Sequence, residues 1–187
     1  MEDFYLEEPT LERKDEAYSY LDEFIKYKSN INGMGGLQRY PYDYNGWLKK
    51  LEDDKIRIPN EEKVPARTYF LVRCEDNKII GMINIRLCLN KRLEKFGGHI
   101  GYSIRPTERG KGYNNINLYL GLLKCKEFGI NEVLMDANIH NLASWKTMEK
   151  LGGVRISEEY NDYEEDVLVR YVINVDEGIK KKEKILK

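Results

Sequence analysis

The sequence predicts a single α/β (α+β) domain in which a mixed, mostly antiparallel twisted sheet carries helices on both of its faces. Two observations carry this prediction. The chain has 187 residues, a length that suits one domain with a sizeable core. Its apolar patterns follow one another as two helices, three strands, then helix, strand, helix and two strands, without a repeat or a linker. A hairpin region that leads into a strand–helix–strand crossover combines antiparallel and parallel pairs in one sheet.

The N-terminal half is expected to provide two helices and a hairpin. Residues 11–28 place apolar side chains on one helical stripe, and 43–53 form a second, shorter helix. The glycine-rich stretch 30–36 lies between them as a loop. The β-branched and aromatic runs at 68–74 and 79–89 are separated by a short polar turn, which predicts a hairpin. The stripe of the first helix consists of Ala17, Leu21, Phe24, Ile25 and Lys28.

The C-terminal half alternates between strands and helices. A strand at 98–105 stops at Pro106, which cannot donate to a strand ladder. The apolar period then changes to that of a helix over 113–128. The remaining elements, in order, are a strand at 131–137, a helix at 142–151 and a strand pair within 154–175 around an acidic turn at 161–166.

Composition excludes several classes of protein. The 31 basic and 32 acidic side chains leave a net charge of −1, so the chain as a whole does not attract nucleic acid or an anionic membrane. No apolar run approaches the roughly 20 residues of a membrane span, and the acidic N-terminus is not a signal peptide. Three cysteines and two histidines lack metal-ligand spacing, so we expect no metal. These features predict a soluble, cytoplasmic protein whose basic tail, 180–187, is a solvated and partly disordered end.

The segment that follows the strand at 98–105 is the strongest chemical signal. Gly110 and Gly112 flank Lys111, so the backbone there can approach a ligand closely. The next helix begins directly after them, and its first N–H groups and its dipole favour an anion. Arg109 adds a full positive charge. The pattern predicts a site for a phosphate-rich ligand, and the absence of GxxxxGK[ST] and GxGxxG argues against ATP and dinucleotides.

Two motifs extend this prediction to a family. Arg109, Gly112 and Asn114 fall on the loop pattern Arg/Gln-x-x-Gly-x-Gly/Ala. Downstream, the run NxxSxxxxEKxGG begins at Asn141 and includes Ser144. With these motifs, residues 98–153 resemble the core of the GNAT superfamily of acyl-CoA-dependent acyltransferases. The whole chain also looks like a bacterial branch of predicted acetyltransferases.

The resemblance implies acetyl-CoA as the acyl donor, held by a core at 98–153, with residues 1–60 on the acceptor side of a single domain over 1–187. It also implies a splay between the strands at 98–105 and 131–137, which opens a cleft for the thioester. Backbone N–H groups of 109–114 would hold the pyrophosphate. The implied cofactor-binding residues are Ile104, Arg105, Arg109, Gly110, Lys111, Gly112, Tyr113, Asn114, Asn141 and Ser144.

The catalytic residues are less strongly indicated. Many GNAT members have a tyrosine at the position of Met148, where it protonates the leaving thiolate, and this chain lacks it. Asp136, His140 and His99 are candidate bases for the acceptor amine, although a buried or loop role is the simpler interpretation of both histidines. Cys125 is expected to be a packing residue. The candidates for substrate recognition are Arg86, Asn90 and Tyr102.

The functional hypothesis is an N-acetyltransferase that moves an acetyl group from acetyl-CoA directly to an amine of a small molecule or peptide. The alternative is a non-catalytic acyl-CoA-binding regulatory domain, which Met148 would suit. Nucleic-acid binding through the basic tail is a third and weaker hypothesis, and neither a nucleic-acid nor a membrane partner is expected. A homodimer is retained as an expectation for the assembly.

Overall fold

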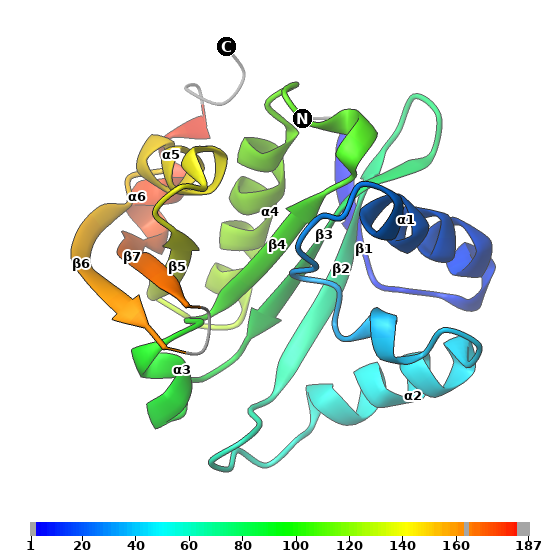
Figure 1. The fold of residues 1–187 in the computed structure, drawn as a ribbon, viewed down its shortest axis with the longest axis horizontal. Helices are drawn as coiled ribbons and strands as arrows, with labels where there is room; N and C mark the ends of the chain where they lie inside the picture. Colours follow the sequence, from blue (N-terminus) through cyan, green and yellow to red (C-terminus); the bar gives the residue numbers. More distant parts are fainter. Residues whose placement is uncertain (1–2, 163–164, 183–187) are drawn as a thin grey trace.

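The computed structural model describes residues 3–162 and 165–182, and it contains two antiparallel sheets (Figure 1). The first has the order β1-β2-β3-β4 and the second the order β5-β7-β6. The strands are β1 (Phe4–Glu7), β2 (Ala66–Arg73), β3 (Lys78–Arg86), β4 (Ile100–Ile104), β5 (Glu132–Asn138), β6 (Val154–Asn161) and β7 (Asp166–Asn174). The predicted acetyltransferase-like fold class, with antiparallel strands and helices, is confirmed.

Helices cover both faces of the first sheet, as predicted. On one face, Phe70 and Val72 pack with α1 (Lys14–Lys26) and α2 (Tyr44–Lys55). On the other face, Ile83 and Ile85 pack with α4 (Tyr113–Glu127) and with the second sheet. Figure 1 shows α1 and α2 to the right of this sheet, with the second sheet to its left. Because both faces are covered, β2 and β3 are apolar at almost every position rather than at alternate ones.

The two sheets touch at one end and diverge from there. The His99 N–H donates to Leu134 O at 2.7 Å, and the Leu134 N–H donates to Nδ1 of His99 at 3.1 Å. Gly98 makes this approach feasible: its φ is +56°, and a Cβ there would lie 2.1 Å from Leu134 O. Beyond this junction β4 and β5 separate, which is the splay expected between 98–105 and 131–137. The parallel pair expected at this place does not form, and every strand pair among the described residues is antiparallel.

Three elements were not predicted from the sequence. β1 pairs with β2 although its residues alternate poorly, α3 (Lys91–Lys95) interrupts the charged connection before β4, and α6 (Val175–Ile179) follows the last strand. The remaining helix, α5 (Leu142–Lys150), agrees with the helix expected at 142–151. Short 3₁₀ turns, which were not predicted either, lie at Leu11–Arg13, Leu37–Arg39 and Pro106–Glu108.

The stripe expected on the first helix is partly wrong. Ile25 is 62% exposed, and Lys28 lies beyond the helix end with a φ of +49°. Tyr20 takes the buried place instead, since it follows Ala17 by three positions and precedes Phe24 by four. Residues 163–164 of the acidic turn and 183–187 of the basic tail lie outside the described residues. In the described part of the chain, no helix is both long enough and apolar enough to cross a membrane.

Candidate active site

A cavity of about 640 Å³ lies between the end of β4 and α5. We call it the donor cavity. Its walls come from β4, the loop before α4, the start of α4, α5 and the loop after α1. The predicted cofactor residues that line it are Ile104, Arg109, Gly110, Gly112, Tyr113, Asn114, Asn141 and Ser144.

Backbone donors form the floor of the donor cavity. Gly110 and Gly112 both have a φ of +79°, in the left-handed region that favours glycine. Gly112 is also the N-cap of α4 and provides no side-chain cap, so the N–H groups of Tyr113 and Asn114 in this 15-residue helix are left without a capping acceptor, whereas the Asn115 N–H donates to Gly112 O at 3.0 Å. A Cβ at Gly110 would meet no protein atom within 4 Å, which leaves that space to a ligand. The sequence-based prediction of an anion cradle therefore matches the local geometry.

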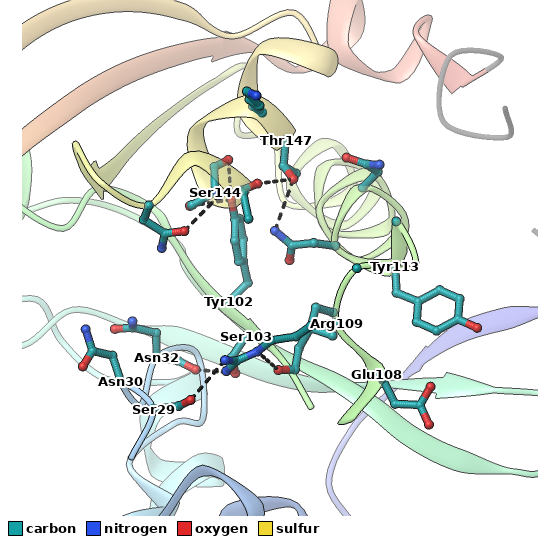
Figure 2. A pocket seen from close by; sticks show the side chains of 18 of the residues that line it. Ser29, Asn30, Asn32, Tyr102, Ser103, Glu108, Arg109, Tyr113, Ser144 and Thr147 are labelled. Atoms are coloured by element: carbon teal, nitrogen blue, oxygen red, sulfur yellow. Dashed lines mark hydrogen bonds between the residues drawn. The ribbon is translucent and has the colours of Figure 1, made fainter. Parts of the chain in front are cut away.

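Arg109 lies across this cavity (Figure 2). Its Nε donates to Ile104 O at 3.2 Å and its Nη1 donates to Ser29 Oγ at 3.0 Å, while the guanidinium stacks over the Phe24 ring. The residue thus connects the end of β4 with the end of α1. Across the cavity, α5 presents Lys146, Thr147 and Lys150, whose positions sequence reasoning did not assign to the site.

Lys111 and Arg105, in contrast, turn away from the donor cavity. Lys111 donates to the Glu108 carboxylate at 2.8 Å, and the same carboxylate accepts hydrogen bonds from Arg73 and Lys78. Burial alone would raise the pKa of Glu108, but hydrogen bonds from Lys111, Lys78 and Arg73 lower it to about 2. Figure 2 shows the Glu108 carboxylate pointing out of the cavity. The charge of Lys111 is therefore used within the protein, contrary to its predicted role.

Arg105 is a structural residue. Its side chain is 2% exposed, its Nε donates to Ile79 O at 2.8 Å, and its Nη1 donates to Glu23 at 2.7 Å. The resemblance implied that the strand end at Ile104 and Arg105 pairs with the cofactor, and the Arg105 N–H donates instead to Ile80 O at 2.8 Å. Tyr113 contributes its backbone to the cavity. Its ring packs against the Phe4 ring, with 5.1 Å between the two ring centroids.

A tyrosine and a serine meet at the centre of the site. The Tyr102 hydroxyl lies 2.9 Å from Ser144 Oγ and donates to Ser144 O at 3.1 Å. Burial raises the pKa of Tyr102 to about 12, although hydrogen bonds from Ser144 and Asn114 oppose this, so the hydroxyl is protonated at neutral pH. Asn141 caps α5 by accepting the Ser144 N–H at 3.2 Å, which fixes the serine.

A second cavity, of about 590 Å³, lies on the other side of these residues. We call it the acceptor-side cavity. Along β4 it is lined by residues 100–102, whereas the donor cavity is lined by 102–104, so the two meet at Tyr102. The residues that line both cavities are Asn30, Asn32, Tyr102, Asn141 and Ser144.

The loop after α1 supplies Asn30 and Asn32 by packing its backbone directly on β4. Gly33 has a φ of +70°, and a Cβ there would lie 2.6 Å from both Gly101 O and Tyr102 Cα. Asn32 O accepts the Ser103 hydroxyl at 2.7 Å. The sequence predicted a glycine-rich loop here, but neither asparagine was assigned to the site; Gly33 was the available signal.

Of the three candidate bases, only Asp136 lines a cavity. Its carboxylate receives Arg170 Nε at 2.8 Å and the Gly97 N–H, so both oxygens are hydrogen bonded. His99 faces neither cavity, its Nδ1 accepts the Leu134 N–H, and burial followed by the charge of Arg86 lowers its pKa to about 4. His140 is exposed in the loop before α5 and also lies outside both cavities. The catalytic roles predicted for the two histidines are therefore not supported by their positions.

Two of the three residues predicted to recognise the substrate line a cavity, and the third does not. Arg86 and Tyr102 line the acceptor-side cavity. Asn90 does not: its Oδ1 caps α3 at Leu93 N, and its Nδ2 donates to two carbonyls of the loop at 60–61. Its position as a helix cap explains why a polar residue follows β3.

Two further residues behave as the sequence suggested. Met148 is fully buried on α5 and borders the acceptor-side cavity, so no hydroxyl is present at that position. Cys125 is fully buried in α4, and burial raises the pKa of its thiol to about 12. Within residues 3–162 and 165–182, no group of three or more His, Cys, Asp or Glu side chains is arranged to hold a metal ion.

Comparisons with known proteins agree with this geometry. A protein-family model described as an acetyltransferase (GNAT) domain matches residues 10–154. No curated protein matches the sequence.

Three solved structures are similar to this chain at low sequence identity. A ribosomal-protein-S5-alanine acetyltransferase from Vibrio fischeri superposes with a TM-score of 0.69 at 16% identity, covering 94% of this chain and 95% of its own. Mycobacterium smegmatis RimJ, in complex with CoA-disulfide, gives 0.71 at 12% identity, with 95% and 87% covered. A spermidine N-acetyltransferase SpeG chimera from Vibrio cholerae and hSSAT gives 0.64 at 12% identity, with 95% and 99% covered. At these identities the likeness establishes the shared fold.

Proposed function

This chain belongs to the GNAT acetyltransferase family, and we propose that it transfers an acetyl group from acetyl-CoA directly to an amine of a small molecule or peptide. The donor cavity would bind acetyl-CoA, and the acceptor-side cavity would bind the amine. Residues 98–153 would form the cofactor-binding core and residues 1–60 the acceptor side of one domain over 1–187. The structures of relatives with CoA-disulfide or with acetyl-CoA support a CoA-type donor.

The observation that carries this proposal is the meeting of two cavities at Tyr102. Direct transfer requires both substrates to reach one point from different sides, so that the amine attacks the thioester without a covalent enzyme intermediate. The buried Cys125, with its raised pKa, offers no thiolate for an alternative covalent route.

The residues of the donor cavity fit a CoA molecule. The open N–H groups at the start of α4 would bind the pyrophosphate, and Lys146 and Lys150 would add charge at the rim. The amide oxygen of Asn114 is buried without a hydrogen-bond partner among the described residues, so it has an acceptor to offer a ligand.

The free edge of β4 supports a place for the pantetheine arm. In the antiparallel ladder Ser103 pairs with Met82, and the Arg105 N–H donates to Ile80 O. Because alternate residues of such a ladder turn their N–H and C=O toward the partner, the backbone groups of Tyr102 and Ile104 face the splay. An amide-containing chain can pair with them there, and one of these N–H groups can donate to the oxyanion that develops during transfer.

Attack on the thioester of acetyl-CoA releases a thiolate. The thiol that this thiolate forms on protonation is expected to have the pKa of an ordinary thiol, about 8.5. The Tyr102 hydroxyl, protonated at neutral pH and positioned by Ser144, would protonate that thiolate in place of the tyrosine that Met148 replaces. Asp136, the sole carboxylate among the described residues that line the acceptor-side cavity, would receive the proton of the amine through water.

The test begins with binding of CoA measured by calorimetry. Gly112→Val places a branched side chain in the anion cradle, and we expect the affinity for CoA to fall at least 100-fold. Gly129→Val is the matched control, because Gly129 has a φ of +72°, meets nothing within 4 Å of its Cβ position and lies outside both cavities. Both variants carry similar backbone strain. Equal loss of CoA binding in the two variants would show that strain, not the cradle, determines affinity.

The second measurement is release of free thiol from acetyl-CoA with a panel of amines. Transfer to at least one amine supports the enzyme. Tight CoA binding without transfer to any amine would instead support the non-catalytic acyl-CoA-binding domain, which the absence of a tyrosine at position 148 favours.

A further inference from the structure

The acceptor-side cavity carries two arginines that no carboxylate neutralises. Arg86 and Arg92 line it, and neither forms an ion pair with a carboxylate of the described residues. The one acidic residue in its lining, Asp136, is paired with Arg170 at 2.8 Å, so its charge is already balanced. The polar surface that remains consists of asparagine amides, Tyr102 and Ser144. The cavity is therefore electropositive.

Arg86 is held in this cavity by backbone carbonyls alone. Its Nη1 donates to Gly97 O at 2.9 Å and to Gly98 O at 2.8 Å, which fixes the guanidinium beside the junction of the two sheets. Burial lowers its pKa, the neighbouring Arg92 lowers it further, and Asp136 raises it in part. A buried guanidinium whose neighbouring carboxylate, Asp136, is already paired with Arg170 is an unfavourable arrangement, and an anion in the cavity would relieve it.

Arg92 is exposed at the mouth of the same cavity. It comes from α3, and its Nη2 donates to Glu62 O at 3.2 Å. An exposed and a buried guanidinium on one cavity can bind a single carboxylate from two sides, since each offers several N–H donors in a fixed plane.

We propose that the acceptor amine carries a carboxylate, which binds between Arg86 and Arg92 while the amine lies near Tyr102. This inference rests on the proposed acetyl transfer and adds the chemical class of the acceptor. It excludes polyamines as preferred acceptors, because their second ammonium group would face two guanidinium groups.

The spacing of the strand gives the length of that acceptor. Gly98, whose carbonyl binds Arg86, lies four positions before Tyr102 along the chain, a separation of at most about 13 Å. An amine at Tyr102 and a carboxylate at Arg86 therefore lie no more than about this distance apart. A peptide N-terminus with an acidic side chain at its third residue has this span.

The test compares two tripeptide amides that differ in one charge, Ala-Ala-Asp-NH₂ and Ala-Ala-Asn-NH₂, as acceptors with acetyl-CoA. We expect kcat/KM to be at least tenfold higher for the aspartate peptide, and the difference to shrink as ionic strength rises. Spermidine is included as the cationic competitor. Equal rates for the two peptides, or faster transfer to spermidine, would overturn the inference while leaving acetyl transfer intact.

Arg92→Gln removes one of the two charges, and Arg92 makes few contacts that folding requires. We expect the preference for the aspartate peptide to fall below threefold in this variant. Lys91→Gln is the matched control, because Lys91 precedes Arg92 in α3, is exposed and lies outside the cavity. The control should retain the full preference; loss of it there would indicate a general surface field instead of a site.

A binding measurement separates this inference from the proposed function. The N-acetylated forms of both tripeptides are titrated into the CoA complex by calorimetry, which needs no turnover. Tighter binding of the aspartate form, lost in Arg92→Gln, supports the carboxylate site even if no amine is acetylated. Equal affinities would reject it whatever the enzyme assay gives.

Discussion

The donor and acceptor-side cavities have similar volumes but are polar for different reasons. The donor cavity is built from backbone N–H groups at Gly112 and α4, with exposed cations such as Lys146 at its rim. The acceptor-side cavity depends on the individual guanidinium groups of Arg86 and Arg92. Backbone donors persist through most substitutions, whereas a charged side chain is lost with a single one. Single substitutions should therefore alter the acceptor-side cavity more readily than the donor cavity.

The largest effect is expected from a substitution at Gly98, where the two sheets that carry the cavities touch. Gly98→Ala should reduce the free energy of unfolding by about 3 kcal/mol, since it combines a φ of +56° with a Cβ 2.1 Å from Leu134 O. Chemical denaturation measures this. Gly129→Ala, with a similar φ and open space around it, should lose only about 1 kcal/mol. Similar losses in the two variants would mean that the junction relaxes freely.

A substitution at Tyr102, where the two cavities meet, should affect turnover more than CoA binding. Tyr102→Phe removes the hydroxyl beside Ser144, and we expect kcat to fall about 10- to 100-fold while CoA affinity changes less than about threefold. Steady-state kinetics and calorimetry give the two numbers. Tyr18→Phe, which loses a hydrogen bond to Tyr40 O outside both cavities, serves as control. A parallel fall in CoA affinity would assign Tyr102 to binding instead.

Glu108 sharpens the comparison because it lines the donor cavity and not the acceptor-side cavity. Glu108→Gln should lower the free energy of unfolding by about 1–2 kcal/mol at pH 7, as the carboxylate ties Lys111 to Arg73 and Lys78. Unfolding at a series of pH values tests whether this stabilisation depends on the negative charge of Glu108. Its pKa lies below the ordinary 4.5, so its contribution is complete above about pH 4.5 and is lost as the pH falls toward 2.

Glu108→Gln should lack the part of the acid-induced loss of unfolding free energy that protonation of Glu108 causes. Glu177→Gln, which breaks an exposed pair with Lys180, should change stability much less. An unchanged acid profile in Glu108→Gln would show that other carboxylates determine it.

The smallest expected effect comes from a helix cap shared by both cavities. Asn141→Ala removes the cap on Ser144, and Asn174→Ala removes the equivalent cap on Glu177 away from the site. Each should lower the free energy of unfolding by about 1 kcal/mol. Only Asn141→Ala should raise the KM of donor and acceptor together. If both variants raise it equally, the cap acts through stability alone.

The sequence predicted the donor cavity better than the acceptor-side cavity, and the reason is local. The strand, the loop with Gly110 and Gly112 and the start of α4 are contiguous, so their geometry follows from neighbouring residues. The ion pairs that Arg105 and Lys111 form with Glu23 and Glu108 could not be foreseen, because these partners come together only when the chain is folded.

The acceptor-side cavity draws on segments that are distant in the sequence. Asn32 arrives on a loop fixed by Gly33, and Arg92 on a helix too short to be predicted from periodicity. Arg86 was proposed from the sequence because a cation in an apolar strand requires a partner, but the carbonyls of Gly97 and Gly98 could not be foreseen. The structural role that the sequence favoured for His99 agrees with its ring, which accepts the Leu134 N–H, although the partner could not be foreseen.

The contact between His99 and Leu134 also has a mechanical consequence. It ties β4 to β5 at residue 99, and β4 is paired with β3 from Ile100 to Ile104, so any rotation about this point involves the whole first sheet. Ile104, at the other end of β4, lies about 17 Å from residue 99 at the rise of a β-strand. A rotation of about 5° between the two sheets would move the backbone groups of Ile104 by about 1.5 Å, the difference between a formed and a broken hydrogen bond. The width of the splay at Ile104 is therefore sensitive to the angle between the two sheets at residue 99.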